Sequence, residues 1–429
     1  MTQKKNNGTI VAIIAMMFLF AMISFVTNMA APFGTIWKNQ YEWAGMVGNL
    51  MNFAAYLFMG IPAGIMITKI GYKKTALVAL ALGFIGIGVQ FISGQFDAGA
   101  ISTFLIYLLG AFICGFSVCI LNTVVNPMLN LLGGGGNRGN QLLQTGGSLN
   151  SLSATLTPLL AGSMIGQVTK DTSMGDVAPL LMIALAIFAA SFVIIYFTKI
   201  EEPDIEVQNV GEGIKGALQF KHLVLGIVAI FFYVGIEIGV PAQLNFYLSQ
   251  PGGVLGSAAI AGTVAGIYWL LMLVGRFTST FISGKVSTRA QIIFVSAVAI
   301  CLLLTAIFLP ESKTIALPGS EASPVDLALF KFEGGTIPMK CIFIVLCGLC
   351  TSVMWGGIFN LATEGLGKYT AAASGLFMTM VVGGGIMPLL QEFIAIRVGA
   401  ILSYWLIIAM LAYILYYGLV GCKVTKRAE

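Results

Sequence analysis

Glu237 is a carboxylate near the middle of a predicted apolar segment, in a chain of 429 residues that is 58% hydrophobic and 9% charged. A charged side chain at the centre of a bilayer is costly, and such residues usually face the interior of a helix bundle or a water-filled cavity, where they have a functional task. We therefore expect whatever this protein moves or senses to pass near Glu237.

A larger group of candidate residues shares neutral amide or indole side chains inside apolar segments. Amides supply both donors and acceptors, as a polyhydroxyl ligand requires, and an indole face offers apolar area to the C–H face of a sugar ring. With Glu237, we select as binding candidates Asn28, Asn122, Asn126, Gln144, Asn245, Trp269, Trp355, Asn360 and Gln391. Each has an alternative role in helix packing, since amides commonly bond neighbouring membrane helices. As a set they favour a sugar over a peptide or a cation.

The other ionisable side chains in or near the apolar segments have simpler interpretations. Arg276, near the cytoplasmic end of its segment, is expected to be a structural partner for helix ends or loop acids. Glu392 is expected to be solvated near the outer face, and His222 to begin a helix at the cytoplasmic interface without relaying protons. Glu364 and Lys368 stand one turn apart and predict a surface ion pair.

Long apolar runs recur from Thr9 to Cys422, separated by short polar interruptions, so the bilayer is the solvent of this chain. A run of about 20 residues spans the hydrocarbon core as a helix, and backbone groups in lipid must be bonded internally. We predict an all-α membrane protein with twelve transmembrane helices. The predicted spans are 9–33, 43–67, 74–95, 101–131, 140–166, 178–199, 222–249, 256–283, 289–309, 340–364, 371–395 and 399–422.

Positive charge predicts the orientation of these helices, because Lys and Arg are retained on the cytoplasmic side. With the N-terminus inside, fifteen such residues lie on the cytoplasmic side and six outside; with Arg276 inside a helix they account for the 22 present. The sequence thus predicts a protein of the cytoplasmic (inner) membrane with both termini in the cytoplasm. The net charge of +5 reflects topology, and no basic stripe suits nucleic acid. We expect a monomer whose partners are lipid and a small ligand.

An acidic stretch from Glu201 to Lys221 divides the chain into two halves. The predicted domains are an N-terminal six-helix bundle at 1–200, a cytoplasmic linker at 201–221 and a C-terminal six-helix bundle at 222–429. Asn-Leu at 130 and Pro-Leu-Leu at 158 recur at 360 and 388, both displaced by 230 positions. Two parallel, pseudo-symmetric halves with a ligand site near the midplane describe the major facilitator fold.

Several longer motifs spread over most of the chain point to one family. They are Phe232-Tyr-Val-Gly-Ile-Glu237, Tyr268-Trp269, Gly275-Arg-Phe277, Asn126-Pro127, Gln144-Thr145, Ile358-Phe-Asn-Leu-Ala362 and Gly383-Gly-Gly-Ile-Met-Pro-Leu-Leu-Gln391. Together they resemble the fucose:proton and glucose/galactose symporter family within the major facilitators. The resemblance implies a secondary transporter that moves a neutral sugar by alternating access.

The chain departs from the pattern of that family at two acidic positions. The segment that resembles F-x-T-N-x-N-D ends in Ala31, and the segment that resembles E-T-x-x-N-P begins with Asn122. After Gln144-Thr145, where the family tends to have Phe-Asn, the chain has Gly146-Gly147. Glu237 stands where glucose/galactose-type members look to carry an acid, so the resemblance assigns to it any coupling to H⁺ or Na⁺.

We therefore predict a secondary active transporter for a monosaccharide or close relative, cation-coupled through Glu237. The alternatives are a sugar uniporter without coupling, an efflux carrier for apolar drugs or small peptides, and a membrane sensor on a transporter fold. An enzyme is not expected, because the sequence shows no paired carboxylates, metal-ligand cluster or nucleophile with a base. No cofactor is expected beyond a coupling ion. The identity of the sugar and the direction of transport stay open.

Overall fold

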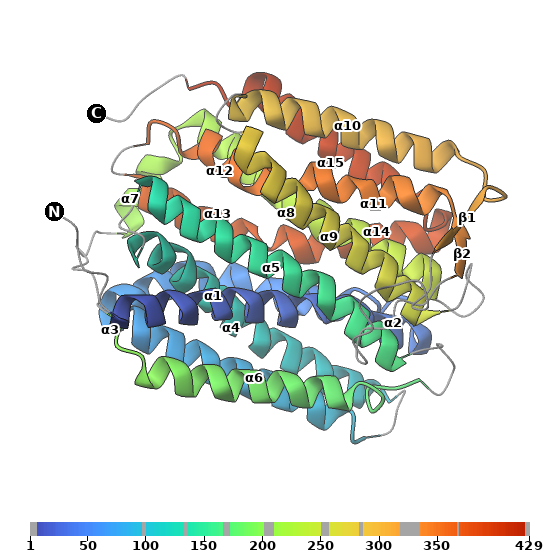
Figure 1. Ribbon diagram of the computed structural model, residues 1–429, viewed down its shortest axis with the longest axis horizontal. Coiled ribbons are helices and arrows are strands. Elements are labelled where there is room, and N and C mark those ends of the chain that lie inside the picture. Colours follow the sequence, from blue (N-terminus) through green and yellow to red (C-terminus); the bar gives the residue numbers. More distant parts are fainter. Residues whose placement is uncertain are drawn as a thin grey trace.

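Long helices lie side by side in the computed structural model (Figure 1), which describes residues 7–96, 100–132, 136–165, 172–200, 210–249, 257–282, 286–317, 335–366 and 369–424. The N-terminal half comprises α1 (Asn7–Asn28), α2 (Ala30–Gln40), α3 (Val47–Ser93), α4 (Ile101–Leu132), α5 (Gly136–Ile165) and α6 (Ala178–Phe197). A short helix, α7 (Val210–Ala217), follows in the predicted linker, whose first residues, 201–209, lie outside the described part.

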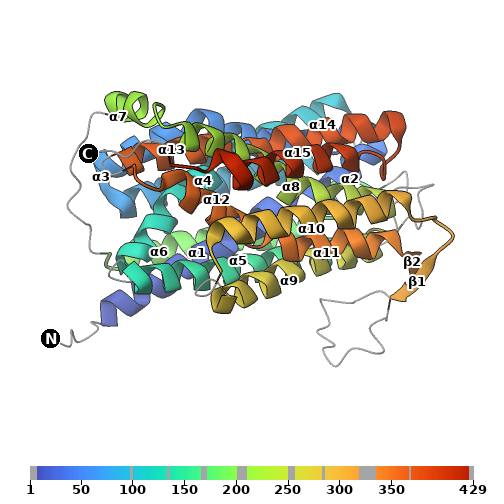
Figure 2. The same cartoon turned by 90° about the horizontal axis from the view of Figure 1, so that it is seen from above.

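The C-terminal half repeats this arrangement of long helices. It comprises α8 (Lys221–Ser249), α9 (Ala258–Ile282), α10 (Thr288–Phe308), α11 (Lys340–Thr351), α12 (Met354–Thr363), α13 (Thr370–Met380), α14 (Gly383–Val398), α15 (Tyr404–Tyr416) and a final π-helical turn, Tyr417–Gly421. Strands β1 (Thr314–Leu317) and β2 (Gly335–Pro338) form an antiparallel hairpin between α10 and α11, with Thr314 opposite Pro338. The hairpin lies at the opposite end of the bundle from the two termini (Figures 1 and 2). We call these the hairpin end and the termini end.

The predicted spans correspond to these helices with differences at their ends. Within the described residues, eleven helical stretches are long and apolar enough to cross a membrane. The remaining predicted span, 140–166, is the more polar helix α5. The first span continues to Gln40 instead of ending at 33, and the spans 43–67 and 74–95 join in α3. Gly71 joins them with a φ of 83°, which a residue with a side chain rarely adopts.

Several membrane-crossing segments are broken partway along their length. The first is interrupted at Met29, because Pro32 has no N–H to donate to the carbonyl of Asn28 one turn earlier. Two further segments are interrupted between α11 and α12 and between α13 and α14. Irregular backbone at membrane depth is tolerated where protein or a water-filled cavity satisfies its polar groups. The breaks therefore indicate where the interior of the bundle is polar.

Pro388 in α14 shows how a freed carbonyl is satisfied by the opposite half. Pro388 has no N–H for the carbonyl of Gly384, one turn earlier. The side-chain amide of Asn49, on α3, donates a hydrogen bond of 2.7 Å to this carbonyl. Asn49 is buried, so the bond replaces a missing helical bond and joins the two halves.

A buried ion pair also joins the halves at the hairpin end. Lys38 Nζ on α2 lies 3.1 Å from Glu392 Oε1 on α14, and the backbone N–H of Met46 donates to Glu392 Oε2 at 2.7 Å. The Lys38 ammonium also lies 5.2 Å from the ring centre of Phe246 on α8. The expectation that Glu392 is solvated is wrong: its side chain is 0% exposed, because the N-terminal half covers this face of α14.

We predict that Asn49→Ala destabilises the protein by about 1–2 kcal/mol, because the carbonyl of Gly384 then lacks a partner. Thermal unfolding in detergent measures the loss. In a Pro388→Ala background, residue 388 regains an N–H for that carbonyl, so Asn49→Ala should cost less there. An equal cost in both backgrounds would contradict this account.

We also predict that Glu392→Ala destabilises the protein by about 3 kcal/mol, because it removes the carboxylate that compensates the charge of Lys38, whose side chain is only 12% exposed. Replacing both partners by Met should cost less, since no buried charge remains. Glu42→Ala is the control at the same end: Glu42 is an exposed residue, so loss of its carboxylate should cost under about 1 kcal/mol. Similar losses for both single variants would show that the Glu392 carboxylate contributes no more than an exposed one.

Candidate functional site

A small cavity lies between the two halves, close to the break between α1 and α2. Its polar lining comes from Thr27, Asn28 and Asn49 of the N-terminal half and from Asn245 and Trp269 of the C-terminal half. Its volume is about 20 Å³, which holds about one water molecule. A sugar therefore needs the halves to separate before these side chains can surround it.

The amides of this cavity are held in place by neighbouring groups. The Asn28 side chain donates to the carbonyl of Ser24 at 2.9 Å and to its hydroxyl at 3.2 Å. The Asn245 side-chain carbonyl, on α8, accepts a 2.9 Å hydrogen bond from the hydroxyl of Thr35 on α2. The Asn245 bond crosses between the halves, so opening the hairpin end would free this amide.

Glu237, the carboxylate predicted from the sequence, forms an ion pair with Arg276. Glu237 Oε1 on α8 lies 3.4 Å from Arg276 Nη2 on α9, and the two side chains are 14% and 18% exposed. Arg276 Nη1 also donates to the hydroxyl of Ser151 at 2.7 Å and to the carbonyl of Gly147 at 3.1 Å, both on α5. The guanidinium thus lies between the carboxylate and the N-terminal half.

Arg276 was not among the predicted site residues, because its place near a helix end suggested a partnership with loop acids. In the structure, Arg276 instead pairs with the intramembrane carboxylate of Glu237. The sequence held a signal for this pairing. A cation and an acid that both lie in apolar segments are expected to pair, since either alone is costly in a membrane.

Two tyrosines lie near this ion pair, and each packs against one of the predicted tryptophans. Tyr233 lies one turn before Glu237 on α8, and its ring centre is 6.1 Å from that of Trp355 on α12. Trp269 packs against Tyr268 on α9, with ring centres 5.4 Å apart at 85°. The buried hydroxyl of Tyr233 lies beside Glu237 but makes no hydrogen bond of normal geometry with any described residue. The two predicted tryptophans therefore border the region of the carboxylate.

Other predicted site residues make contacts within their own half. The Asn122 amide on α4 donates to the hydroxyl of Tyr56 at 2.8 Å. The Asn126 amide donates to the carbonyl of Asn122 at 2.7 Å. Both side chains are half-buried. These bonds orient the amides, and a role in binding stays a prediction for both.

The last three predicted amides lie in different settings. Gln391 on α14 is buried and donates to the hydroxyl of Ser403 at 3.3 Å, within the C-terminal half. Asn360 on α12 is exposed. Gln144 belongs to α5, but its side chain lies outside the described part, as does Lys368, the predicted partner of Glu364.

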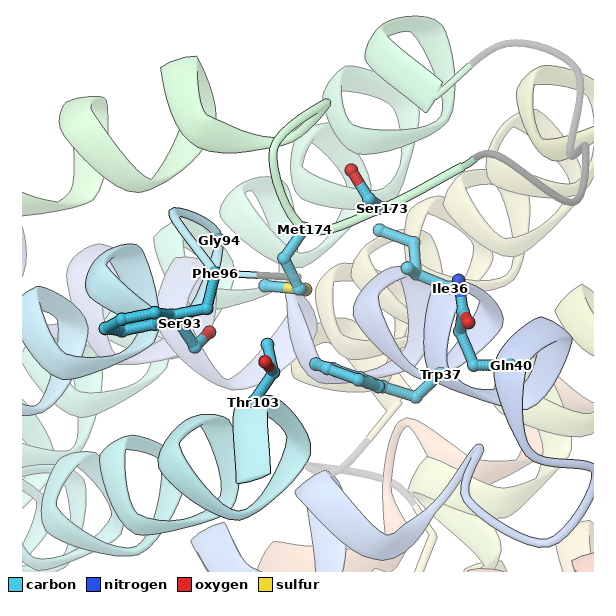
Figure 3. A pocket seen from close by; sticks show the side chains of 9 residues that line it. All are labelled: Ile36, Trp37, Gln40, Ser93, Gly94, Phe96, Thr103, Ser173 and Met174. Carbon is cyan, nitrogen blue, oxygen red and sulfur yellow. The ribbon is translucent and has the colours of Figure 1, made fainter. Parts of the chain in front are cut away.

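A second cavity lies at the hairpin end of the N-terminal half. Trp37, Ser93, Thr103 and Met174 are among the residues around it (Figure 3). Its volume is about 10 Å³, too little for a sugar and no more than a water molecule needs. The cavity between the halves is therefore the better candidate for a ligand site.

Comparison with known proteins places the chain in one family. Residues 9–387 match the Major Facilitator Superfamily. A glucose/galactose transporter of Brucella abortus is 30% identical, over 98% of this chain and 96% of that protein. A putative glucose/galactose transporter of Helicobacter pylori is 27% identical over 99% of both chains. The L-fucose-proton symporter of Escherichia coli is 23% identical over 92% of this chain and 89% of that protein.

The fold agrees with the sequence matches. A crystal structure of the Escherichia coli fucose:proton symporter superimposes with a TM-score of 0.68 and 20% identity, over 96% of this chain and 99% of that one. The predicted resemblance and the predicted fold of twelve helices in two halves are both confirmed. The chain is a multi-pass membrane protein that belongs to the Major Facilitator Superfamily, and it is a transporter and not an enzyme.

Proposed function

We propose that the protein is a secondary active transporter that moves a neutral monosaccharide by alternating access, with Glu237 as the coupling residue. The carrying observation is the Glu237–Arg276 ion pair, which lies between the halves and is bordered by the predicted tryptophans. Relatives along the whole chain are named glucose/galactose transporters, which supports the same substrate class.

The charges of the site favour a ligand without net charge. Glu237 and Arg276 neutralise one another, and the polar groups of the cavity are amides and hydroxyls. An anionic or cationic substrate would need an unmatched charge in the site, whereas sugar hydroxyls can donate to amide oxygens and accept from amide nitrogens. The surfaces of Trp269 and Trp355 suit the apolar face of a sugar ring.

Alternating access explains why the cavity is too small for its proposed ligand. The hairpin end is closed by the Lys38–Glu392 pair and by the bond from Asn49 to Gly384. A drug-sized ligand occupies a pocket of roughly 300 Å³ or more, so binding requires the halves to rotate apart. We place the termini end in the cytoplasm, by the distribution of Lys and Arg, in the cytoplasmic membrane, and we propose a monomer as the transporting unit.

Coupling falls to Glu237 because the other family acids are replaced. Ala31 lines the cavity and cannot ionise, and Asn122 carries an amide bonded to Tyr56. A carboxylate that is charged in one conformation and neutralised by H⁺ or Na⁺ in the other supplies the alternation that coupling requires. Glu237 meets this requirement, since it lies between the two halves.

We predict that the wild-type protein in proteoliposomes accumulates a labelled monosaccharide when a pH or Na⁺ gradient is applied. Glu237→Gln should lose at least about tenfold of this accumulation but keep sugar exchange without a gradient, because the amide cannot bind and release a cation. Glu364→Gln is the control, since Glu364 is an exposed carboxylate at the end of α12.

Three outcomes would contradict parts of this proposal. If the wild type takes up no sugar under any gradient, the sugar is the wrong substrate class. If it equilibrates sugar but never accumulates it, the protein is a uniporter. If Glu237→Gln accumulates sugar as the wild type does, coupling resides elsewhere.

We further predict that Trp269→Ala raises the KM for sugar by about three- to tenfold, because the ring that packs against the sugar is lost. Trp269→Phe should raise it less, since part of the aromatic face remains. Trp405→Ala is the control, because Trp405 is 46% exposed on α15. An unchanged KM in Trp269→Ala, measured by initial rates of uptake, would remove Trp269 from the binding site.

A further inference from the structure

Arg276 is the charged group through which the proposed coupling residue contacts the opposite half. Its Nη2 faces Glu237 on α8 of its own half, and its Nη1 donates to Ser151 and Gly147 on α5 of the N-terminal half. A guanidinium is a planar fork with several donors, so it can hold a carboxylate and a second element together. The state of Glu237 and the contact between the halves therefore share one side chain.

Helix α5 lies directly against this guanidinium. A Cβ added at Gly147 would lie 4.0 Å from Arg276 Nη1, which is ordinary van der Waals contact. Ser151, one turn later, is fully buried, and its hydroxyl is the closer acceptor. Further along, Gly162 of α5 and Gly262 of α9 let the two helices approach closely, since neither has room for a side chain. The contact between α5 and α9 thus extends from these glycines to Arg276.

The position of Arg276 is favourable only while Glu237 is ionised. A guanidinium away from bulk water is stable when a carboxylate compensates its charge and is strongly unfavourable when it loses that partner. Among the described residues, titratable groups that interact with Glu237 are Tyr233 on α8 and Arg276 and Tyr268 on α9. Cys347 and Cys350 of α11 face Tyr268 behind them. Arg276 is the cationic member of this set.

We propose that Arg276 is a positioning residue that transmits the charge state of Glu237 to the contact between the halves. The ionised carboxylate keeps Arg276 bonded to Ser151 and Gly147, which stabilises the conformation with a closed hairpin end. Neutralisation of Glu237 by H⁺ or Na⁺ removes the counter-ion, Arg276 releases α5, and the hairpin end opens. This role rests on the proposed function, because it assigns a coupling task to Glu237.

The test measures the distance between the halves in the absence of sugar. Spin labels at Gln95→Cys and Lys313→Cys report the separation of the two halves at the hairpin end, since both positions are exposed. Cys301, the exposed native cysteine, is replaced by Ser, while the other six are buried. Electron–electron distances are recorded in lipid during a pH titration and a Na⁺ titration.

In the wild type we expect the long-distance population to grow as pH falls or as Na⁺ rises. Ser151→Ala keeps the ion pair but removes a bond to α5, so the ratio of closed to open forms should fall about tenfold. Arg276→Lys keeps the charge, but a compact ammonium cannot hold Glu237 and α5 together, so its response to pH or Na⁺ should be lost. Without sugar, Glu237→Gln should keep the hairpin end mainly open at every pH and Na⁺ concentration tested.

Thr155→Ala is the matched control on the same face of α5. Its hydroxyl bonds the carbonyl of Ser151 at 2.9 Å within its own helix, so its loss should leave the distance response unchanged. If Ser151→Ala and Arg276→Lys both respond as the wild type does, Arg276 is a static counter-ion and the proposal is wrong.

A sugar-uptake assay on the same variants separates this inference from the proposed function. If the wild type takes up no sugar but the variants alter the distance response as expected, the substrate is wrong and the role of Arg276 stands. If the wild type accumulates sugar and the two variants match it in accumulation and in distance response, the role of Arg276 is wrong and the proposed function stands.

Discussion

The fold is organised around a charge that cannot be left alone in a membrane. Glu237 and Arg276 compensate one another at 3.4 Å, and the guanidinium Nη1 also donates to Ser151 and Gly147 of the opposite half. Three helices, α5, α8 and α9, must therefore meet at one place. The close approach of α5 and α9 at Gly162 and Gly262 makes that meeting geometrically available. When the halves move, this ion pair must either stay intact or have its charges compensated in another way.

The same rule governs the backbone, since a carbonyl in a bilayer needs a partner as much as a charge does. Pro32 and Pro388 each remove a helical donor, and the consequences differ. Beside Pro32 the helix breaks and the segment lines the central cavity. Beside Pro388 the carbonyl of Gly384 takes its hydrogen bond from Asn49, which belongs to the other half. Polar groups that a helix cannot satisfy internally thus join the halves or face the cavity between them.

Much of the fold could be predicted from hydrophobic run lengths and from the acidic stretch after Glu201, because the bilayer fixes the length of each helix. Details that depend on contacts between helices could not be predicted from these features. Glu392 was expected in solvent, since its distance from a helix end says nothing of Lys38, 354 positions away in sequence. The ion pair of Glu237 could have been inferred, because an isolated acid in lipid requires a cation and Arg276 was present. Asn49 could have been linked to Pro388 only with the helix packing in hand, and its place in the cavity was missed for that reason.

The absence of the further family acids does not argue against coupling through Glu237 in this structure. Ala31 and Asn122 leave one carboxylate where the family pattern has further acids, which at first weakens the case for coupling. A single acid can couple if its charge state changes the energy of one conformation relative to the other. Arg276 supplies that link, because it bonds Glu237 in one half and α5 in the other. Additional acids would each need a partner of their own, whereas one shared guanidinium serves both purposes. The described lining of the cavity between the halves contains amides, a hydroxyl and an indole but no charged side chain, so the proposed neutral sugar would meet no unmatched charge there.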